Sequence, residues 1–225
     1  VTVAEEALDC STRYVNILKI SENVKSLSNF GTAYLKSIIV DAKNKYFKSV
    51  DNVLYTKDMK KLVCYPALRE GRSFIVPENV EILGEGCFSP SYNINRITLP
   101  KGLKTIEAYA FSVCSVTQIS IPKGVTKIPE GCFILSDLES ITFESKKMII
   151  GDLAFFYCMR LKSITLPNKT TKIGANAFRE CHRLTSIIIP SSVKYIGKSA
   201  FSTEYISRIK VTKGSYAEKY VDKYY

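Results

Sequence analysis

Residues that usually carry catalysis are sparse in this chain. His182 is the only histidine among 225 residues, and Cys181 directly precedes it. A nucleophilic cysteine needs a base whose side chain meets its own, and adjacent residues rarely allow this. With no second histidine, the sequence offers nothing to a His-based triad or a conventional zinc site. Acidic residues are scattered without a recurring pair for glycoside hydrolysis, so we predict no enzyme activity, no metal and no cofactor.

The seven cysteines follow the chain's own period and form no CxxC pair. Five of them fall in two recurring positions, one holding Cys114, Cys158 and Cys181 and the other Cys87 and Cys132. A residue that recurs with a structural repeat is first a packing residue, and free cysteine behaves as a small buried hydrophobe. We therefore predict buried thiols at these five positions. Cys10 and Cys64 lie outside both columns and are not placed by this argument.

A column of phenylalanines reveals an internal repeat, which decides the architecture. Its members are separated by 23, 22, 22, 23 and 23 residues, and they are Phe88, Phe111, Phe133, Phe155, Phe178 and Phe201. Each repeat also contains a segment such as Ile97-Thr-Leu99-Pro100, in which apolar residues two apart have the period of a strand with one buried face. Proline then ends most of these strands, because it cannot donate a ladder hydrogen bond.

The Ala-Phe pair of each repeat is expected on a short helical segment, with a glycine at a tight corner before it. No single turn can bury its apolar side alone, so stacked turns must supply the core. The sequence therefore predicts an α/β repeat solenoid, with a parallel β-sheet on one face and short helices or turns on the other.

The combined pattern I-x-I-P-x-x-V-x-x-I-G-x-x-A-F-x-x-C-x-x-L-x-x-I resembles the BspA-like subfamily of leucine-rich repeats. The resemblance covers residues 74–209, although Glu144 stands where proline is expected. It implies a right-handed leucine-rich-repeat coil of the kind found on surface proteins of gut and oral bacteria and of some mucosal protists. It also implies adhesion, with extracellular-matrix proteins among the partners.

The sequence divides into a single solenoid domain, 1–225, with irregular ends. Residues 1–38 are interpreted as degenerate N-terminal repeats, and 74–209 as six regular repeats of 22 or 23 residues. Between them, 39–73 breaks the period and predicts a β-hairpin inserted as a flap at the solenoid edge. Residues 210–225 are expected to form a C-terminal cap, because Ser215-Tyr-Ala-Glu218 is a capping-box pattern followed by apolar residues at helical spacing.

The first candidate binding surface is the outer face of the predicted sheet. If the Ile-x-Ile side chains face inward, the residues between and before them face outward. These are Arg96, Thr98, Gln118, Ser120, Ser140, Thr142, Ser163, Thr165, Ser186, Ile188, Arg208 and Lys210. The set is a ladder rich in serine and threonine, with basic ends and no aromatic anchor. Such a ladder is also an ordinary composition for solvent-facing strand positions, so both interpretations stay open.

The second candidate surface is a stripe of lysines just after each strand. It contains Lys101, Lys104, Lys123, Lys127, Lys146, Lys147, Lys169, Lys172 and Lys194. Stacked about one strand spacing apart, roughly 4.8 Å, these residues would form a basic stripe attractive to an acidic partner. A lysine-rich surface that serves only solubility is the alternative, and the formal net charge of +11 fits both.

Together these observations predict a non-catalytic binding or adhesion module, secreted or at the cell surface. Its expected partner is a protein or glycan, such as host extracellular matrix or mucin. The alternative is an intracellular scaffold, or a polyanion-binding module that uses the lysine stripe to hold nucleic acid or sulfated glycan. A third reading, a repeat appendage to a catalytic domain, would require sequence beyond Val1 or Tyr225. We expect a monomer. We also expect no membrane insertion, because no apolar run approaches the roughly 18 residues that span a bilayer. No signal peptide is expected within this segment.

Overall fold

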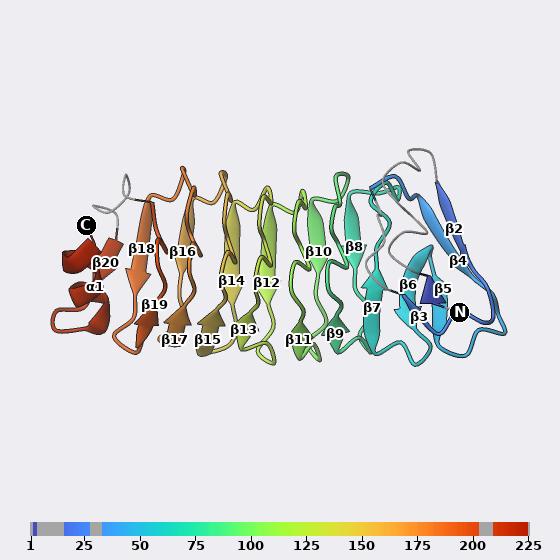
Figure 1. The fold of residues 1–225 in the computed structure, drawn as a ribbon, viewed down its shortest axis with the longest axis horizontal. Coiled ribbons are helices and arrows are strands. Elements are labelled where there is room, and N and C mark those ends of the chain that lie inside the picture. The colour runs from blue at the N-terminus through green and yellow to red at the C-terminus, as the bar shows by residue number, and fades with distance from the viewer. Residues whose placement is uncertain (1, 4–15, 28–32, 203–208, 225) are drawn as a thin grey trace.

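The computed structural model describes residues 2–3, 16–27, 33–202 and 209–224. Successive turns of chain stack side by side from the N-terminal to the C-terminal end (Figure 1). A seven-stranded parallel sheet runs along the stack in the order β20-β18-β16-β14-β12-β10-β8. Its strands are β8 (Ser73–Ile75), β10 (Arg96–Thr98), β12 (Gln118–Ile121), β14 (Ser140–Phe143), β16 (Ser163–Thr165), β18 (Ser186–Ile189) and β20 (Ile209–Val211). The solenoid and its parallel sheet were both predicted, and both are confirmed.

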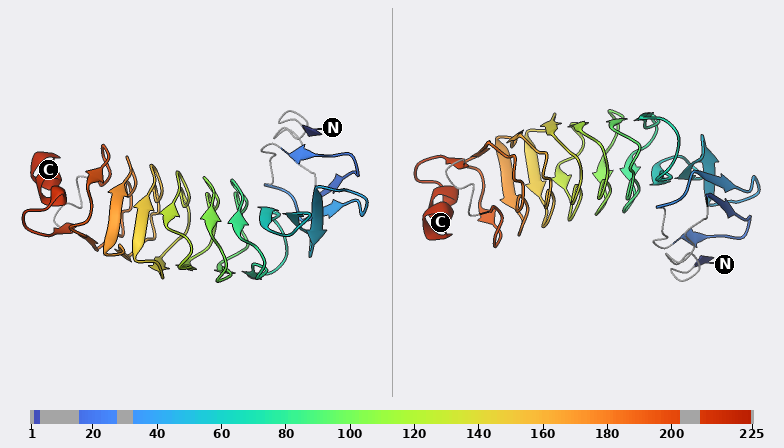
Figure 2. Two further views of the ribbon diagram at one scale, coloured as in Figure 1. Left: turned by 90° about the horizontal axis from the view of Figure 1, so that it is seen from below. Right: turned by 90° about the horizontal axis from the view of Figure 1, so that it is seen from above.

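Each turn also contributes a second, shorter strand, which the sequence analysis missed. These strands are β9 (Ile82–Leu83), β11 (Thr105–Ile106), β13 (Lys127–Ile128), β15 (Lys147–Ile150), β17 (Lys169–Ile173) and β19 (Tyr195–Ile196). They pair in parallel as a four-stranded sheet, β13-β15-β17-β19, and as the pair β11-β9. We call this row of short strands the second sheet. It follows the first sheet along the stack (Figure 2). The last two residues of the Val-x-x-Ile step, such as Lys127 and Ile128, form these strands.

The third side of each turn is built of turns, one of the two alternatives predicted for it, and the Ala-Phe pairs do not lie on the short helical segment that was expected. Four successive phenylalanines, from Phe111 to Phe178, have a left-handed residue two positions before and two positions after them. These residues are Tyr109 and Val113, Gly131 and Leu135, Leu153 and Tyr157, and Asn176 and Glu180, with φ between 50° and 62°. Alternation between left-handed and right-handed conformations points backbone donors along the solenoid axis instead of along a helix.

Those donors form a hydrogen-bond ladder between neighbouring turns. The amides of Tyr109, Phe111 and Val113 donate to the carbonyls of Glu130, Cys132 and Ile134 at 3.0, 2.9 and 2.9 Å. An α-helix would have satisfied the same groups within its own segment. The helical segment was predicted wrongly because most of these left-handed positions hold residues that disfavour the left-handed conformation. The sequence therefore gives no sign of the turns that they form.

The phenylalanine column forms a continuous aromatic stack through the core. Consecutive rings from Phe88 to Phe201 are stacked with centroids 5.1–5.6 Å apart and planes within 7° of parallel. The strand isoleucines and the repeat cysteines pack around this stack in a single buried cluster. Burial of this apolar surface, at roughly 25 cal/mol per Å², is the main force that holds the turns together.

The recurring glycine is explained by a close approach between turns. A Cβ on Gly151 would lie 2.6 Å from the carbonyl carbon of Pro129 and 2.7 Å from the amide nitrogen of Glu130. The φ of Gly151 is not in the left-handed region. This position therefore requires glycine because the backbone of the preceding turn leaves no room, and not because of a special turn conformation.

The predicted hairpin exists, but it is not a flap. Strands β6 (Val53–Thr56) and β7 (Lys61–Cys64) pair antiparallel, and β5 (Phe47–Val50) adds a third strand. β7 also pairs in parallel with β9, so the hairpin completes the second sheet. Tyr55 and Tyr65 have exposed fractions of 1% each, which places the insertion within the core. Val53, Tyr55 and Leu62 of the hairpin pack in the same buried cluster as the side chains of the first regular repeat.

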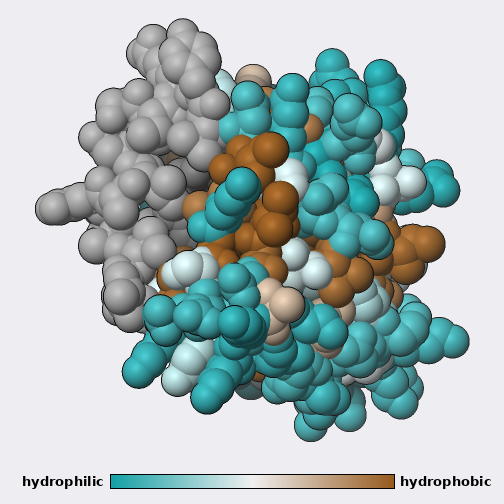
Figure 3. Space-filling view, turned by 90° about the vertical axis from the view of Figure 1, so that its right-hand side faces the viewer, coloured by the Kyte–Doolittle hydropathy of each residue, from teal (hydrophilic) through white to brown (hydrophobic). Residues whose placement is uncertain are grey.

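The N-terminal part packs around a smaller separate cluster. β2 (Ile17–Ile20) pairs in parallel with β4 (Ser37–Val40), and β1 (Thr2–Val3) pairs with β3 (Ser26–Leu27). The buried Asn44 amide donates to the carbonyls of Ser21 and Val24 at 2.8 and 3.0 Å. Viewed from this end, apolar side chains gather near the centre of the face, with polar ones above and below them (Figure 3). Cys10 lies outside the described residues.

A short helix lies at the C-terminal end of the described stack. In α1 (Tyr216–Tyr224) the amide of Glu218 donates to the Ser215 hydroxyl at 3.2 Å, and the Glu218 carboxylate accepts from the amide of Gly214. Ala217 and Tyr220 are buried, and the Tyr220 hydroxyl donates to the carbonyl of Gly197 at 2.8 Å. These contacts join the helix to the last turns. No helix in the described part of the chain has the length and apolar character to cross a membrane.

Candidate functional site

The outer face of the seven-stranded sheet carries two straight columns of side chains. Because strand residues alternate between faces, burial of the Ile-x-Ile positions turns their neighbours outward. Parallel pairing then aligns equivalent residues from turn to turn: Arg96 lies opposite Gln118, which lies opposite Ser140. The first column contains Ser73, Arg96, Gln118, Ser140, Ser163 and Ser186. The second contains Ile75, Thr98, Ser120, Thr142, Thr165, Ile188 and Lys210.

Eleven of the twelve sheet-face residues singled out from the sequence lie in these columns. Ser140 and Ser186 are half-buried, and the other nine are exposed. Arg208 lies outside the described residues. In the second column, exposed isoleucines stand near the two ends, with 72% of Ile75 and 55% of Ile188 exposed. The sequence analysis included Ile188 but missed Ile75. The alternation of inward and outward strand residues would have identified Ile75 if it had been applied to the turn before Arg96.

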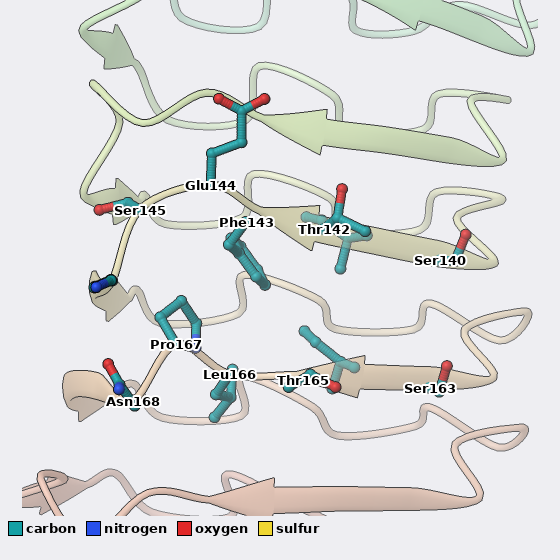
Figure 4. Close-up of a pocket in the computed structure, with 13 residues that line it drawn as sticks. Ser140, Thr142, Phe143, Glu144, Ser145, Ser163, Thr165, Leu166, Pro167 and Asn168 are labelled. Atoms are coloured by element: carbon teal, nitrogen blue, oxygen red, sulfur yellow. The ribbon is translucent and has the colours of Figure 1, made fainter.

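A groove of about 620 Å³ opens on this face between β14 and β16. Thr142, Phe143, Thr165 and Asn168 are among its lining residues. Glu144, at the position where most turns have proline, stands at its edge and points away from Pro167 and Asn168 (Figure 4). The departure at Glu144 was visible in the sequence, but a groove depends on how two neighbouring turns pack.

Ion pairs join adjacent turns just before the strands. Glu139 accepts hydrogen bonds from Arg160 and Lys162, both at 2.7 Å. The Lys162 ammonium, followed by Arg160, lowers the pKa of the Glu139 carboxyl below its ordinary value. Arg160 and Lys162 therefore have acidic partners within the protein, Glu139 and, for Arg160, also Asp137.

The nine lysines of the predicted stripe do not form one uniform row. Lys101, Lys123 and Lys146 lie at the corner after the first strand, while the others lie on or beside the second sheet. Lys104 shares the Glu81 carboxylate with Lys60, and these two hydrogen bonds lower the pKa of Glu81 to about 2. In the part of the chain that the structure describes, the other eight stripe lysines make no ion pair.

The side chains that could perform chemistry are held in structural environments. All six described cysteines are buried and free, and burial raises the pKa of Cys64, Cys114 and Cys158 to about 12. A thiol with so high a pKa is a poor nucleophile at neutral pH. His182 is half-buried, with its Nε2 atom 3.3 Å from a Glu180 oxygen. Among the described residues, no group of three or more His, Cys, Asp or Glu side chains could hold a metal ion.

Comparison with known proteins identifies the family. The model of the BspA-type leucine-rich-repeat region, in six copies, matches residues 64–170 and 135–221, which together cover more than half of the chain. The chain therefore belongs to the BspA-type leucine-rich-repeat family. This membership indicates a non-catalytic, protein-binding type of module. No curated protein matches the chain significantly.

Solved bacterial structures share the fold. A leucine-rich-repeat protein from Eubacterium ventriosum aligns with a TM-score of 0.69 and 25% identity, over 89% of this chain and 60% of that one. The pneumococcal vaccine antigen PcpA aligns with a TM-score of 0.64 and 21% identity, over 87% of this chain and 55% of that one. A leucine-rich cell surface protein from Faecalibacterium prausnitzii aligns with a TM-score of 0.58 and 24% identity, over 88% of this chain and 52% of that one. The chain thus spans 52–60% of the length of these structures.

Proposed function

We propose that the chain is a secreted or cell-surface adhesion module that binds a protein through the outer face of the seven-stranded sheet. The observation that carries this proposal is the groove between β14 and β16, set within two register-aligned columns of polar side chains. Host extracellular-matrix proteins and mucin are the partners we propose to test first. One structural relative is named as a cell surface protein, which supports this location.

The sheet face has physical properties suited to recognition. The two strands that flank the groove, β14 and β16, are each paired on both sides, so little backbone freedom is lost when a partner binds. Serine and threonine hydroxyls both donate and accept hydrogen bonds, which allows them to pair with an exposed peptide backbone or polar side chain. The columns contain no Trp or Tyr, which many interfaces have at their centre, and their one arginine, Arg96, lies away from the groove. We therefore propose that the partner supplies the apolar anchor and inserts it in the groove beside the half-buried Phe143.

The test measures binding of the purified chain to matrix proteins and mucin at low and high salt. The double variant Thr142→Arg/Thr165→Arg places two bulky cations in the groove at exposed positions, so the fold should persist. Loss of a central contact of about 2 kcal/mol corresponds to roughly a 30-fold increase in Kd. A second variant changes Arg96, Gln118 and Ser140 to alanine and tests the first column separately.

Thr105→Arg/Ser191→Arg is the matched control, because both residues are exposed beside or on the second sheet and neither lines the groove. The proposal requires salt-resistant binding that the groove variant loses and the control retains. Equal loss in both variants, or full binding by the groove variant, would place recognition elsewhere. Antibody staining of intact source cells distinguishes a surface module from an intracellular scaffold, since only the former is labelled without permeabilisation.

A further inference from the structure

The second sheet is locally widened at β15 and β17. These strands have four and five residues, whereas β9, β11, β13 and β19 have two each. The cause is in the sequence of one corner, where Glu144–Lys147 replaces the Pro-x-Gly-Val of residues 122–125. Without proline and glycine the chain forms no tight turn there. Lys147 is exposed at the position of the buried Val125, and Met148 fills the buried place one residue later.

The widened region presents cations and an apolar side chain in register. Lys147 lies opposite Lys169, and Ile149 lies between Lys127 and Lys172. The register shifts between Met148 and Ile149, and such bulges re-aim side chains and recur at functional sites. A hollow of about 360 Å³ lies over this region, with Lys147, Ile149 and Lys169 among its lining residues.

Lys147 is held in place by a buried serine. The Ser145 hydroxyl donates to the carbonyl of Lys147 at 2.9 Å and accepts from the amide of Lys147 at 3.3 Å. Ser145 has an exposed fraction of only 7%. The backbone that carries this lysine is therefore fixed by the fold.

The charge of this region is not balanced by the chain itself. At two other places the fold puts a glutamate between two cations, as Glu81 does for Lys60 and Lys104. Lys127, Lys147, Lys169 and Lys172 have no acidic partner among the described residues. Like charges directly opposite each other destabilise a sheet. The opposed pair Lys147 and Lys169 therefore costs stability in the free protein. An external anion bound between the two lysines would offset that cost.

We propose that this part of the second sheet is a binding site for a linear sulfated polysaccharide. The four lysines provide cations along the sheet, at strand spacings of about 4.8 Å and its multiples, for sulfate groups carried by an extended chain. Ile149, with 38% exposure, provides an apolar surface between cations for the C–H face of a sugar ring. Single-stranded nucleic acid is less favoured, because it is usually held by stacking on several aromatic rings. Tyr195, opposite Lys172, is the one aromatic side chain in the second-sheet column from Lys127 to Tyr195.

This site is separate from the proposed protein-binding face. It lies on the other sheet, and none of its four lysines lines the groove between β14 and β16. The two proposals can therefore fail independently. A variant of the groove should leave polysaccharide binding intact, and a variant of the second sheet should leave protein binding intact.

The test measures binding of the whole chain to a heparin oligosaccharide, with its desulfated form, single-stranded DNA and poly-glutamate as competitors. The variant Lys147→Gln/Lys169→Gln/Lys172→Gln should weaken heparin binding by roughly tenfold or more, because three closely placed cations are removed. Lys19→Gln/Lys43→Gln/Lys45→Gln removes the same charge from exposed lysines of the N-terminal part and should keep most of the affinity. Ile149→Ser should weaken heparin binding without a change in charge.

Three results would overturn the proposal. Equal losses in the two lysine variants would show that only net charge matters. Desulfated heparin that binds as well as heparin would remove the role of sulfate. Competition by DNA or poly-glutamate at equal concentration, with an unchanged Ile149→Ser variant, would identify a nonspecific polyanion surface. Folding of each variant is checked by thermal unfolding, and removal of the opposed lysines should raise the melting temperature.

Discussion

Phe111 and Phe133, from neighbouring turns, stack with ring centroids 5.1 Å apart and planes 4° from parallel. Each ring is fully buried, and the same contact is repeated along the solenoid. The turns are therefore joined at their centre by side chains that face each other across about one strand spacing. Stability of such a protein is roughly a sum of the turns and of the interfaces between them.

Phe133→Ala should reduce the free energy of unfolding by about 3–5 kcal/mol, because it leaves a cavity in the middle of the stack. Phe156→Ala is the control, since the half-buried Phe156 contacts the Tyr157 ring and is not a member of the stack. Chemical denaturation followed by circular dichroism measures both. Similar losses in the free energy of unfolding for the two variants would show that the aromatic stack contributes no more to stability than a half-buried ring outside it.

Gly151→Ala should destabilise the protein, because its Cβ would lie 2.6 Å from a backbone atom of the preceding turn. Overpacking of this kind costs typically about 1–3 kcal/mol. Gly102→Ala is the matched control: its nearest contact would be 3.7 Å away, and its φ is not left-handed. That substitution should be neutral or slightly stabilising, since alanine restricts the unfolded chain. Comparable melting temperatures for the two variants would contradict the close-approach explanation.

Acid should remove the stabilisation that Glu81 provides. The pKa of Glu81 is lowered from 4.5 to about 2 by hydrogen bonds from Lys104 and Lys60. Its contribution is therefore complete above about pH 4.5 and is lost as the pH falls towards 2. Glu81→Gln should flatten the stability profile in this window, and high salt should weaken the effect because the group is exposed. Glu78→Gln, at an exposed residue without an ion pair in the described chain, should leave the profile unchanged.

Native-state alkylation should spare the six described cysteines. Burial raises the pKa of each thiol and also blocks the reagent. Mass spectrometry after iodoacetamide treatment at pH 8 should find Cys64, Cys87, Cys114, Cys132, Cys158 and Cys181 unmodified until denaturant is added. Rapid modification of any of them in the folded protein would show that its turn opens readily.

The sequence predicted the sheet-face columns more accurately than it predicted the other sides of the coil. Alternation along Arg96–Thr98 places the outer residues directly, because strand periodicity is a local property. The lysine stripe was less accurate. Lys104 and Lys127 fall in comparable parts of successive turns, yet Lys104 shares Glu81 with Lys60 whereas Lys127 has no acidic partner in the described chain. Whether an acid from a neighbouring turn reaches a lysine depends on register and side-chain direction.

The sequence by itself determined the repeat, the coil with its parallel sheet, the capping box and the buried cysteine columns. Each of these depends on the spacing or the polarity of residues, and both can be recognised along the sequence without the folded structure. The tertiary structure alone decided the second sheet, the left-handed turns around the phenylalanines, the place of the hairpin in the core, and the groove beside Phe143. These features arise from hydrogen bonds and contacts between residues about 22 positions apart, so the chain must be stacked before the physical forces that select them can act.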